Sequence, residues 1–444
     1  MKKTAVIYIL LSLIVFFALY ILHEKSEVQE AVNVQETTIR ELRSEVNVTM
    51  LTDETEQSIP PTGEDEAYAE TLTEADVVEV TEPKQWSSFV DSVQKLSDTA
   101  LDEICENFDA VGVQCAVIED GRVAGSYVYG WADRENRVAV TQNTKYRVAS
   151  LSKLLTSMIF MRLADEGTVQ LDGDISDYYN FTVRNPSYPN DVITPKMLMT
   201  HTASIIDGQM FNRSLESYSG IPIRTVLKSD SNYSSAQPGT SHVYSNFSAA
   251  LVGSVCELAT NTGFEALAHS LFLDPLEIDG GYVASSIENR DDIGLLYGGT
   301  STLQSQLWAQ FSSTLGQTVH LVQGNLTISA VDYAQLLCVL LNKGVLTDGT
   351  RLLSEKACED IFTVWYGDAS SGVGLGCFTQ NNVIGERNVF YHTGSSYGMY
   401  SSFVVDPLTG DGVVVLTSGA DYSMDSATEI YTICLQLIRA LFPQ

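Results

Sequence analysis

The stretch "RVASLSKLLTSM", residues 147–158, places Ser150 three positions before Lys153 and then continues as an apolar run. If a helix begins here, both side chains lie on one face, because residues three apart are neighbours on a helix. The first N–H groups of a helix have no internal partners, so they would stabilise an alkoxide forming on Ser150. S-x-x-K is not specific alone. Residues 92–95 repeat it, and an N-cap serine followed by a surface lysine gives the same pattern.

Two later segments supply the missing context. "SHVYSNFSAA" contains Tyr244 and Asn246 as Y-x-N just before an apolar run, although Y-x-N also occurs at 178–180 and 188–190. "FYHTGSSYGMY" contains H-T-G at 392–394, and H-x-G occurs nowhere else in the sequence. The three motifs follow one another in the order S-x-x-K, Y-x-N, H-T-G, which makes the set far more specific than any member.

With these motifs in this order, the chain resembles the serine β-lactamase-related hydrolases. That family includes class C β-lactamases, D-Ala-D-Ala carboxypeptidases and related esterases. The resemblance extends from about Ala110 to the C-terminus and includes the segments "ITPKMLMTHTAS" and "DPLTGDGVVVLTSG". It implies a β-lactamase/transpeptidase-like fold and hydrolysis through an acyl-enzyme.

The resemblance also implies a role for each motif residue. Ser150 would be the acylated nucleophile. Lys153 would share its proton and hold Tyr244 toward the phenolate, so that Tyr244 acts as general base, because a neighbouring cation lowers the pKa of a phenol. The N–H groups of Ser150 and Ser395 would form the oxyanion hole. The substrate-binding residues would be Asn246, His392, Thr393, Gly394 and Ser395.

Some positions depart from the family pattern. Class C β-lactamases carry Lys where this chain has His392, whereas carboxypeptidases and esterases of the group often carry His. Imidazole is mostly neutral at pH 7 and anchors a carboxylate less strongly than lysine, which disfavours a dedicated β-lactamase. "THTAS", residues 200–204, lacks the glycine expected two residues after its second threonine, and 296–324 is an unusual segment that could shape the pocket. We expect His201 to be a structural hydrogen-bonding residue.

The remaining chain predicts an α+β fold. We expect a helix from about residue 86, then two strands joined by a turn at Asp120-Gly121, and then a helix over 150–166. Helical pieces and loops follow, then strands in the last third and a final helix over about 423–441. We therefore expect an antiparallel sheet built from both ends of the chain, flanked by helices, with an inserted mainly helical region.

The N-terminal composition predicts a membrane anchor and a tether. Residues 4–22 carry no charge and follow two lysines, so we expect 1–22 to be a transmembrane signal anchor with the rest outside the cytoplasmic membrane. A cleaved signal peptide is the alternative, but the apolar core is long and no A-x-A-like site follows. Residues 23–84 are strongly acidic and are expected to form a disordered linker. The hydrolase domain is then 85–444.

Charge and cysteine usage exclude other function classes. The formal net charge of −31 disfavours nucleic-acid binding, which requires a basic surface. The seven cysteines lack metal-ligand spacing, so we expect buried free thiols and neither a metal nor another cofactor, although one or two disulfides are compatible with the sequence.

The expected substrate is a small peptide of the peptidoglycan type ending in D-Ala, with β-lactams as acylating ligands. An esterase or β-lactamase of the same fold, or a penicillin-recognising sensor without turnover, is an open alternative.

Overall fold

The structure is a computed structural model that describes residues 89, 93–217, 221–298, 301–303, 314–317 and 322–443. The predicted anchor at 1–22 and the predicted linker at 23–84 lie outside these residues. Within the described part of the chain, no helix combines the length and the hydropathy needed to cross a bilayer.

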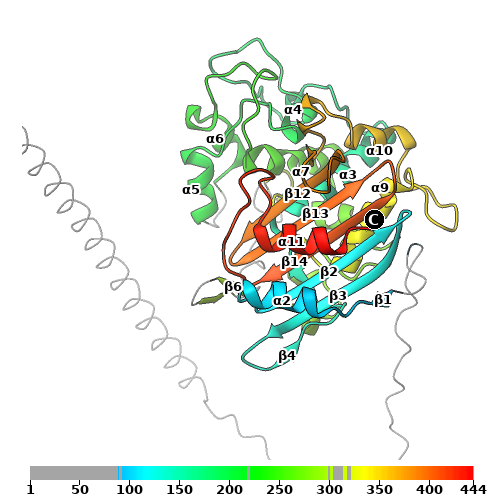
Figure 1. Cartoon of the computed structure of the whole chain (residues 1–444). Coiled ribbons are helices and arrows are strands. Elements are labelled where there is room, and N and C mark those ends of the chain that lie inside the picture. The colour runs from blue at the N-terminus through cyan, green and yellow to red at the C-terminus, as the bar shows by residue number, and fades with distance from the viewer. Residues whose placement is uncertain are drawn as a thin grey trace, which may run out of the picture. The chain divides into compact units, whose positions relative to one another are not determined.

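One large sheet, visible in Figure 1, draws its strands from both ends of the described chain. In order across the sheet, its strands are β1 (Gln94–Lys95), β3 (Arg122–Asp133), β2 (Gly112–Glu119), β14 (Asp411–Ser418), β13 (Met399–Asp406), β12 (Val389–Ser396), β11 (Phe378–Gln380), β10 (Ser371–Val373) and β9 (Tyr366–Asp368), and β4 (Val138–Ala139) pairs with β3. Neighbours run antiparallel except β1, which pairs with β3 in parallel. The predicted α+β architecture is confirmed, with a mixed rather than purely antiparallel sheet.

In chain order, most helices and the short strand pairs come after the N-terminal strands β1–β4 and before the C-terminal strands β12–β14. The helices are α2 (Thr99–Asn107), α3 (Ser152–Asp165), α4 (Pro195–Met199), α5 (Gln209–Ser217), α6 (Ile223–Leu227), α7 (Asn246–Thr260), α8 (Phe264–Ala268), α9 (Ala330–Leu341), α10 (Glu355–Ile361) and α11 (Thr432–Leu441). Two short pairs join β5 (Tyr146–Arg147) to β8 (Thr327–Ile328) and β6 (Leu296–Gly298) to β7 (Ser301–Leu303). A single 3₁₀ turn, η1 (Ala149–Leu151), leads directly into α3.

Both faces of the sheet are buried, because helices cover each of them. Each strand sends alternate side chains to opposite faces. On β14, Val413 and Val415 pack with α2 and α11 on one face. Val414 and Leu416 point the other way and join the core formed with α3 and α9. Figure 1 shows α2 and α11 lying across one face of the sheet. Burial on both faces explains why "GVVVLTS" is apolar at every central position instead of alternating.

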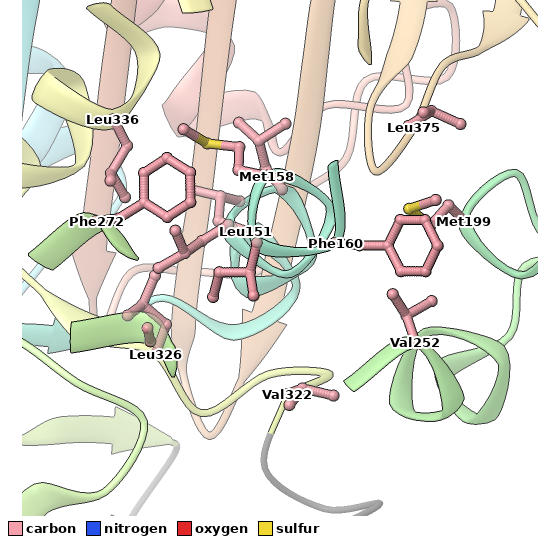
Figure 2. Packing of buried hydrophobic residues seen from close by; sticks show 14 of the residues in the cluster. Leu151, Met158, Phe160, Met199, Val252, Phe272, Val322, Leu326, Leu336 and Leu375 are labelled. Atoms are coloured by element: carbon pink, nitrogen blue, oxygen red, sulfur yellow. The ribbon is translucent and has the colours of Figure 1, made fainter. Parts of the chain in front are cut away.

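Helix α3 lies at the centre of the larger core. Figure 2 shows apolar side chains around it, among them Leu151, Phe160 and Val252. Every residue of α3 from Ser152 to Met161 is buried, including the polar Lys153 and Thr156. Its start is held by hydrogen bonds as well, since the Tyr333 hydroxyl donates to the Leu151 carbonyl at 2.9 Å. The segment that carries the S-x-x-K motif is therefore rigidly positioned.

Local expectations from the sequence were met unevenly. The turn at Asp120-Gly121 is present, with φ of 49° and 70° at the two residues. The helix expected from residue 86 is wrong within the described residues: Gln94–Lys95 is an edge strand, and α2 begins at Thr99 after the Asp98 side chain caps it. The last helix begins at Thr432 rather than near 423. All seven cysteines are buried and free.

Candidate active site

The side chains of Ser150, Lys153 and Tyr244 meet at the N-terminal end of α3. The Lys153 ammonium nitrogen lies 2.9 Å from Ser150 Oγ. The Tyr244 hydroxyl donates to the same Ser150 oxygen at 2.9 Å, across a sequence separation of 94 residues. The Ser150 hydroxyl is therefore within hydrogen-bond distance of both an amine and a phenol, which is the geometry required to activate a weak serine nucleophile.

Backbone geometry presents Ser150 to the cleft. The preceding Ala149 has φ of 51°, a left-handed conformation that costs a non-glycine residue about 1 kcal/mol or more. The bend is held in place because the Ser152 hydroxyl donates to the Ala149 carbonyl at 2.6 Å and accepts from Leu326 N at 3.0 Å. Strand β5 thus turns sharply into α3, and the nucleophile lies at the turn.

Lys153 is buried and uses all three of its donors. Its Nζ donates to Ser150 Oγ at 2.9 Å, to Asn246 Oδ1 at 2.9 Å and to the Gln323 carbonyl at 2.7 Å. Burial lowers the pKa of Lys153 from 10.5 to about 7, against an opposing effect of the Asp207 carboxylate. Gln323 belongs to the unusual segment 296–324, so that segment does contribute to the site.

The pKa of Tyr244 shifts opposite to the sequence expectation. Burial raises the pKa of the phenol, and the hydrogen bond with Ser150 offsets this only in part. The residue is 37% exposed, so this effect concerns its hydroxyl end, which faces Ser150, rather than the whole ring. Near neutral pH the phenol keeps its proton, and the neutral Lys153 amine is the better proton acceptor.

Asp207 positions the Y-x-N motif and was not identified from the sequence. One carboxylate oxygen accepts from Ser245 Oγ at 2.9 Å and from Phe247 N at 2.8 Å. The other accepts from both the backbone N and the side-chain Nδ2 of Asn246, at 3.1 and 2.9 Å. Asp207 therefore caps α7 and orients Asn246 toward Lys153. No local pattern marks it, because it contacts residues 38–40 positions away in the chain.

His201 has the structural role expected for it. Its Nδ1 accepts from the Ser245 backbone N at 3.2 Å, and its ring centre lies 4.5 Å from that of Tyr244. Burial lowers the pKa of His201 well below its usual value, so the ring is a neutral acceptor. Nearby, Ser204 has φ of 59° at the position where a glycine was expected, and its hydroxyl accepts from Asn185 Nδ2 at 2.9 Å.

Strand β12, which contains H-T-G, has an edge beside the nucleophile that no described strand pairs with beyond Tyr391. Pairing of β11 with β12 ends at Phe378↔Tyr391, whereas β12 continues beside β13 to Ser396. A Cβ at Gly394 would lie 2.6 Å from the Val148 carbonyl and 3.1 Å from the backbone N of Ser150. Only glycine lets β12 approach the nucleophile turn this closely.

His392 is a neutral, buried acceptor. It is 2% exposed, and burial lowers its pKa to about 3. Its Nδ1 lies 2.6 Å from the Thr393 carbonyl, so this nitrogen carries the proton and donates. Its Nε2 is then an acceptor, and it has no hydrogen-bond partner among the described residues.

A cleft of about 660 Å³ opens at this site. Six of the residues expected to be functional line it: Ser150, Tyr244, Asn246, His392, Thr393 and Ser395. The described residues that line it include no Lys or Arg, and Arg387 lies instead over the Phe442 ring, 5.8 Å from its centre. In the described part of the chain, no group of three or more His, Cys, Asp or Glu side chains could hold a metal ion.

Comparison with known families matches residues 101–436 to the beta-lactamase family. Protein flp of Staphylococcus aureus (strain MRSA252) is 22% identical over 337 residues, which is 74% of this chain and 63% of that protein. The chain thus spans less than two thirds of the length of the first curated relatives it matches. D-alanyl-D-alanine-carboxypeptidase/endopeptidase AmpH of Escherichia coli (strain K12) is 34% identical over 126 residues, 28% of this chain and 31% of AmpH.

Two solved structures share the fold. The octameric penicillin-binding protein homologue from Pyrococcus abyssi aligns with a TM-score of 0.62 and 20% identity, over 77% of this chain and 76% of that one. EstCE1, a hydrolase with promiscuous acyltransferase activity, aligns with a TM-score of 0.59 and 18% identity, over 72% of this chain and 92% of that one.

Proposed function

Because this chain belongs to the beta-lactamase family, whose members are serine hydrolases, we propose that it hydrolyses an ester or amide through an acyl-enzyme on Ser150. The observation that carries the proposal is the contact of Ser150 Oγ with Lys153 Nζ and the Tyr244 hydroxyl, each at 2.9 Å. These two neighbours supply one proton acceptor and one proton donor for acyl transfer.

Acylation begins when neutral Lys153 takes the Ser150 proton and Oγ attacks the substrate carbonyl. The bond to the leaving group then breaks, and the leaving group takes a proton from Tyr244. The Tyr244 phenolate recovers a proton from the Lys153 ammonium, whose Nζ lies 5.2 Å from the centre of the Tyr244 ring. Water enters in the second half, loses a proton to the same pair, and releases the acid and free Ser150. Protons and bonds balance over the cycle, and no further reactant is required.

The surrounding groups would stabilise and orient the reacting carbonyl. The backbone N–H groups of Ser150 and Ser395 are the proposed oxyanion hole, for which one donor is typically worth about 3–4 kcal/mol. The free edge of β12 would take an extended substrate as an added strand. Asn246, held by Lys153 and Asp207, would bond the amide on the acyl side.

The substrate class follows from the cleft lining. A D-Ala-D-Ala carboxypeptidase acting on cell wall is the candidate that the sequence favours, and the name of AmpH supports it. Such a substrate ends in a carboxylate, whereas the cleft lining, as far as the structure describes it, carries no Lys or Arg, and His392 is neutral. An ester or an amide without that carboxylate fits this cleft better, and the carboxypeptidase is our second candidate.

We also propose that the domain works outside the cytoplasmic membrane, anchored by residues 4–22. The support is the uncharged apolar run after two lysines. The acidic linker of about sixty residues would give the domain a reach of roughly 40–50 Å from the bilayer if it is flexible.

Turnover by the full chain tests the proposed function. The chain is incubated separately with a p-nitrophenyl ester, a D-Ala-D-Ala peptide and a fluorescent penicillin. Ser150→Ala should abolish ester turnover and labelling, while Ser92→Ala, in the other S-x-x-K copy, should abolish neither. Equal activity of wild type and Ser150→Ala would refute the proposal. A stable label without turnover of either substrate would instead indicate the sensor.

A further inference from the structure

The cleft has an unusual charge balance. Among the described residues that line it, Glu429 carries the one formal charge expected at pH 7. The two lining histidines are neutral there, because burial lowers the pKa of His392 to about 3 and lowers that of His242 below its usual value. The polar lining around the substrate position is therefore neutral or negative.

Among the described residues that line the cleft, no Lys or Arg is present to balance Glu429. Lys153 already donates to three protein acceptors, which uses all the hydrogens of its ammonium. The internal segments that the structure does not describe, 218–220, 299–300, 304–313 and 318–321, contain no Lys or Arg in the sequence. A substrate carboxylate would thus meet no Lys or Arg among the described residues that line the cleft.

Glu429 lines the cleft together with residues of strand β12, the strand proposed to pair with substrate. Its carboxylate is close enough to act on two neighbours: it partly offsets the lowering of the His242 pKa by burial, and it adds to the raising of the Tyr391 pKa by burial. Tyr391 is on β12 and points to the same face as Thr393 and Ser395, because strand side chains alternate. All of these residues line the cleft, and no ion pair forms with Glu429 within the described residues. The carboxylate thus lacks a protein counter-charge beside the expected substrate path.

The walls of the cleft suit a cation. Aromatic rings attract cations through their faces, and the lining includes the rings of Tyr366, Phe378, Tyr391 and Tyr431. The buried Nε2 of His392 is an acceptor, and no described residue donates to it. The net charge of −31 for the whole chain adds a field that draws cations and repels anions.

We propose that this cleft selects esters or amides whose acyl part carries a protonated amine, with Glu429 as the counter-charge. This inference rests on the proposed function, since it names the substrate class of the same site. The substrate ammonium would pair with the Glu429 carboxylate beside the aromatic rings of the cleft. A substrate that ends in a carboxylate would be disfavoured.

A matched ester series tests the selection with the full chain. The p-nitrophenyl esters of 6-aminohexanoate, heptanoate and adipate have acyl chains of similar length that end in an ammonium, a methyl and a carboxylate. We expect kcat/KM to fall in that order, with the ammonium ester about three- to tenfold above the methyl ester at low salt. Raising the salt concentration should shrink the preference, because Glu429 is exposed and its charge is screened.

Two variants separate the cleft charge from the general field. Glu429→Gln should reduce the ratio of ammonium to methyl ester toward one. Glu386→Gln removes the same charge from an exposed residue that does not line the cleft, and it should keep the wild-type ratio. A wild type that prefers the adipate ester, or equal ratios in wild type and Glu429→Gln, would overturn the proposal.

Failure of the proposed function would look different. If Ser150→Ala hydrolyses all three esters as fast as wild type, the nucleophile assignment fails, whatever the charge preference. Binding then decides the selection independently: calorimetry with the three corresponding primary amides on Ser150→Ala should show the ammonium compound binding most tightly. Equal or weaker binding of the ammonium amide would contradict the inference without any turnover being measured.

Discussion

The pH dependence of acylation distinguishes Lys153 from Tyr244 as the proton acceptor. Burial brings the pKa of Lys153 to about 7, so about half of the amine is neutral at that pH. An ordinary lysine would be neutral in roughly one molecule in 3,000 at pH 7. Because only the neutral amine can take the Ser150 proton, kcat/KM should fall about tenfold per pH unit below pH 7 and level off above it. At pH 5 it should be about 1% of the plateau.

The assay is kcat/KM for a neutral p-nitrophenyl ester between pH 5 and 9, which reports groups of the free enzyme. Tyr244→Phe is the perturbation. With a neutral alkyl ester, whose alkoxide leaving group needs a proton, it removes the donor and should lower the plateau by about 10²–10⁴. With the p-nitrophenyl ester, whose phenolate leaves without a proton, the loss should be much smaller. The midpoint near pH 7 should stay, because Tyr244 is not among the causes of the Lys153 shift. A wild-type midpoint above pH 9, or loss of the acid limb in Tyr244→Phe, would refute Lys153 as the base.

Three other substitutions test the supporting structure. Gly394→Ala places a Cβ 2.6 Å from the Val148 carbonyl, so we expect at least a tenfold loss of kcat/KM and about 1–3 kcal/mol lower unfolding free energy; wild-type kinetics would contradict the close approach. Asp207→Asn leaves a donor facing the α7 N–H groups and Asn246. The free energy of unfolding, measured in denaturant, should fall by about 1–3 kcal/mol, and kcat/KM should fall at least tenfold. Unchanged values would exclude a positioning role. Lys153→Met should stabilise the chain: the folded pKa of about 7 lies below the unfolded 10.5, so the wild type is penalised by up to about 5 kcal/mol at or below pH 7. That advantage, partly offset by lost hydrogen bonds, should shrink as pH rises toward 10.5, and a pH-independent difference would contradict a buried titrating amine.

The sequence predicted those features that depend on local pattern. S-x-x-K before an apolar run located Ser150 and Lys153 at the start of a buried helix, and Asp120-Gly121 located a hairpin turn. The strand-like runs in the last third, with "DPLTGDG" as the turn between two of them, located two neighbouring strands of the sheet. These signals work because helix periodicity, strand periodicity and turn chemistry are properties of neighbouring residues.

Features that depend on distant contacts could not be read from the sequence. Gln94–Lys95 pairs with β3 as an edge strand instead of belonging to a helix. The local pattern could not predict this, because the pairing depends on a strand about thirty residues further along the chain. Asp207 meets α7 only in the folded chain. The direction of the Tyr244 pKa shift also depends on burial of its hydroxyl end, which no motif encodes.

The most direct test of the account is the site of the covalent intermediate. The full chain is mixed with a neutral p-nitrophenyl ester, quenched in acid within the first turnover, and mapped by mass spectrometry after proteolysis. We predict the acyl mass on the peptide that carries Ser150 and none in Ser150→Ala. An acyl group on another residue with Ser150 unmodified, or turnover in Ser150→Ala at the wild-type rate, would contradict the account.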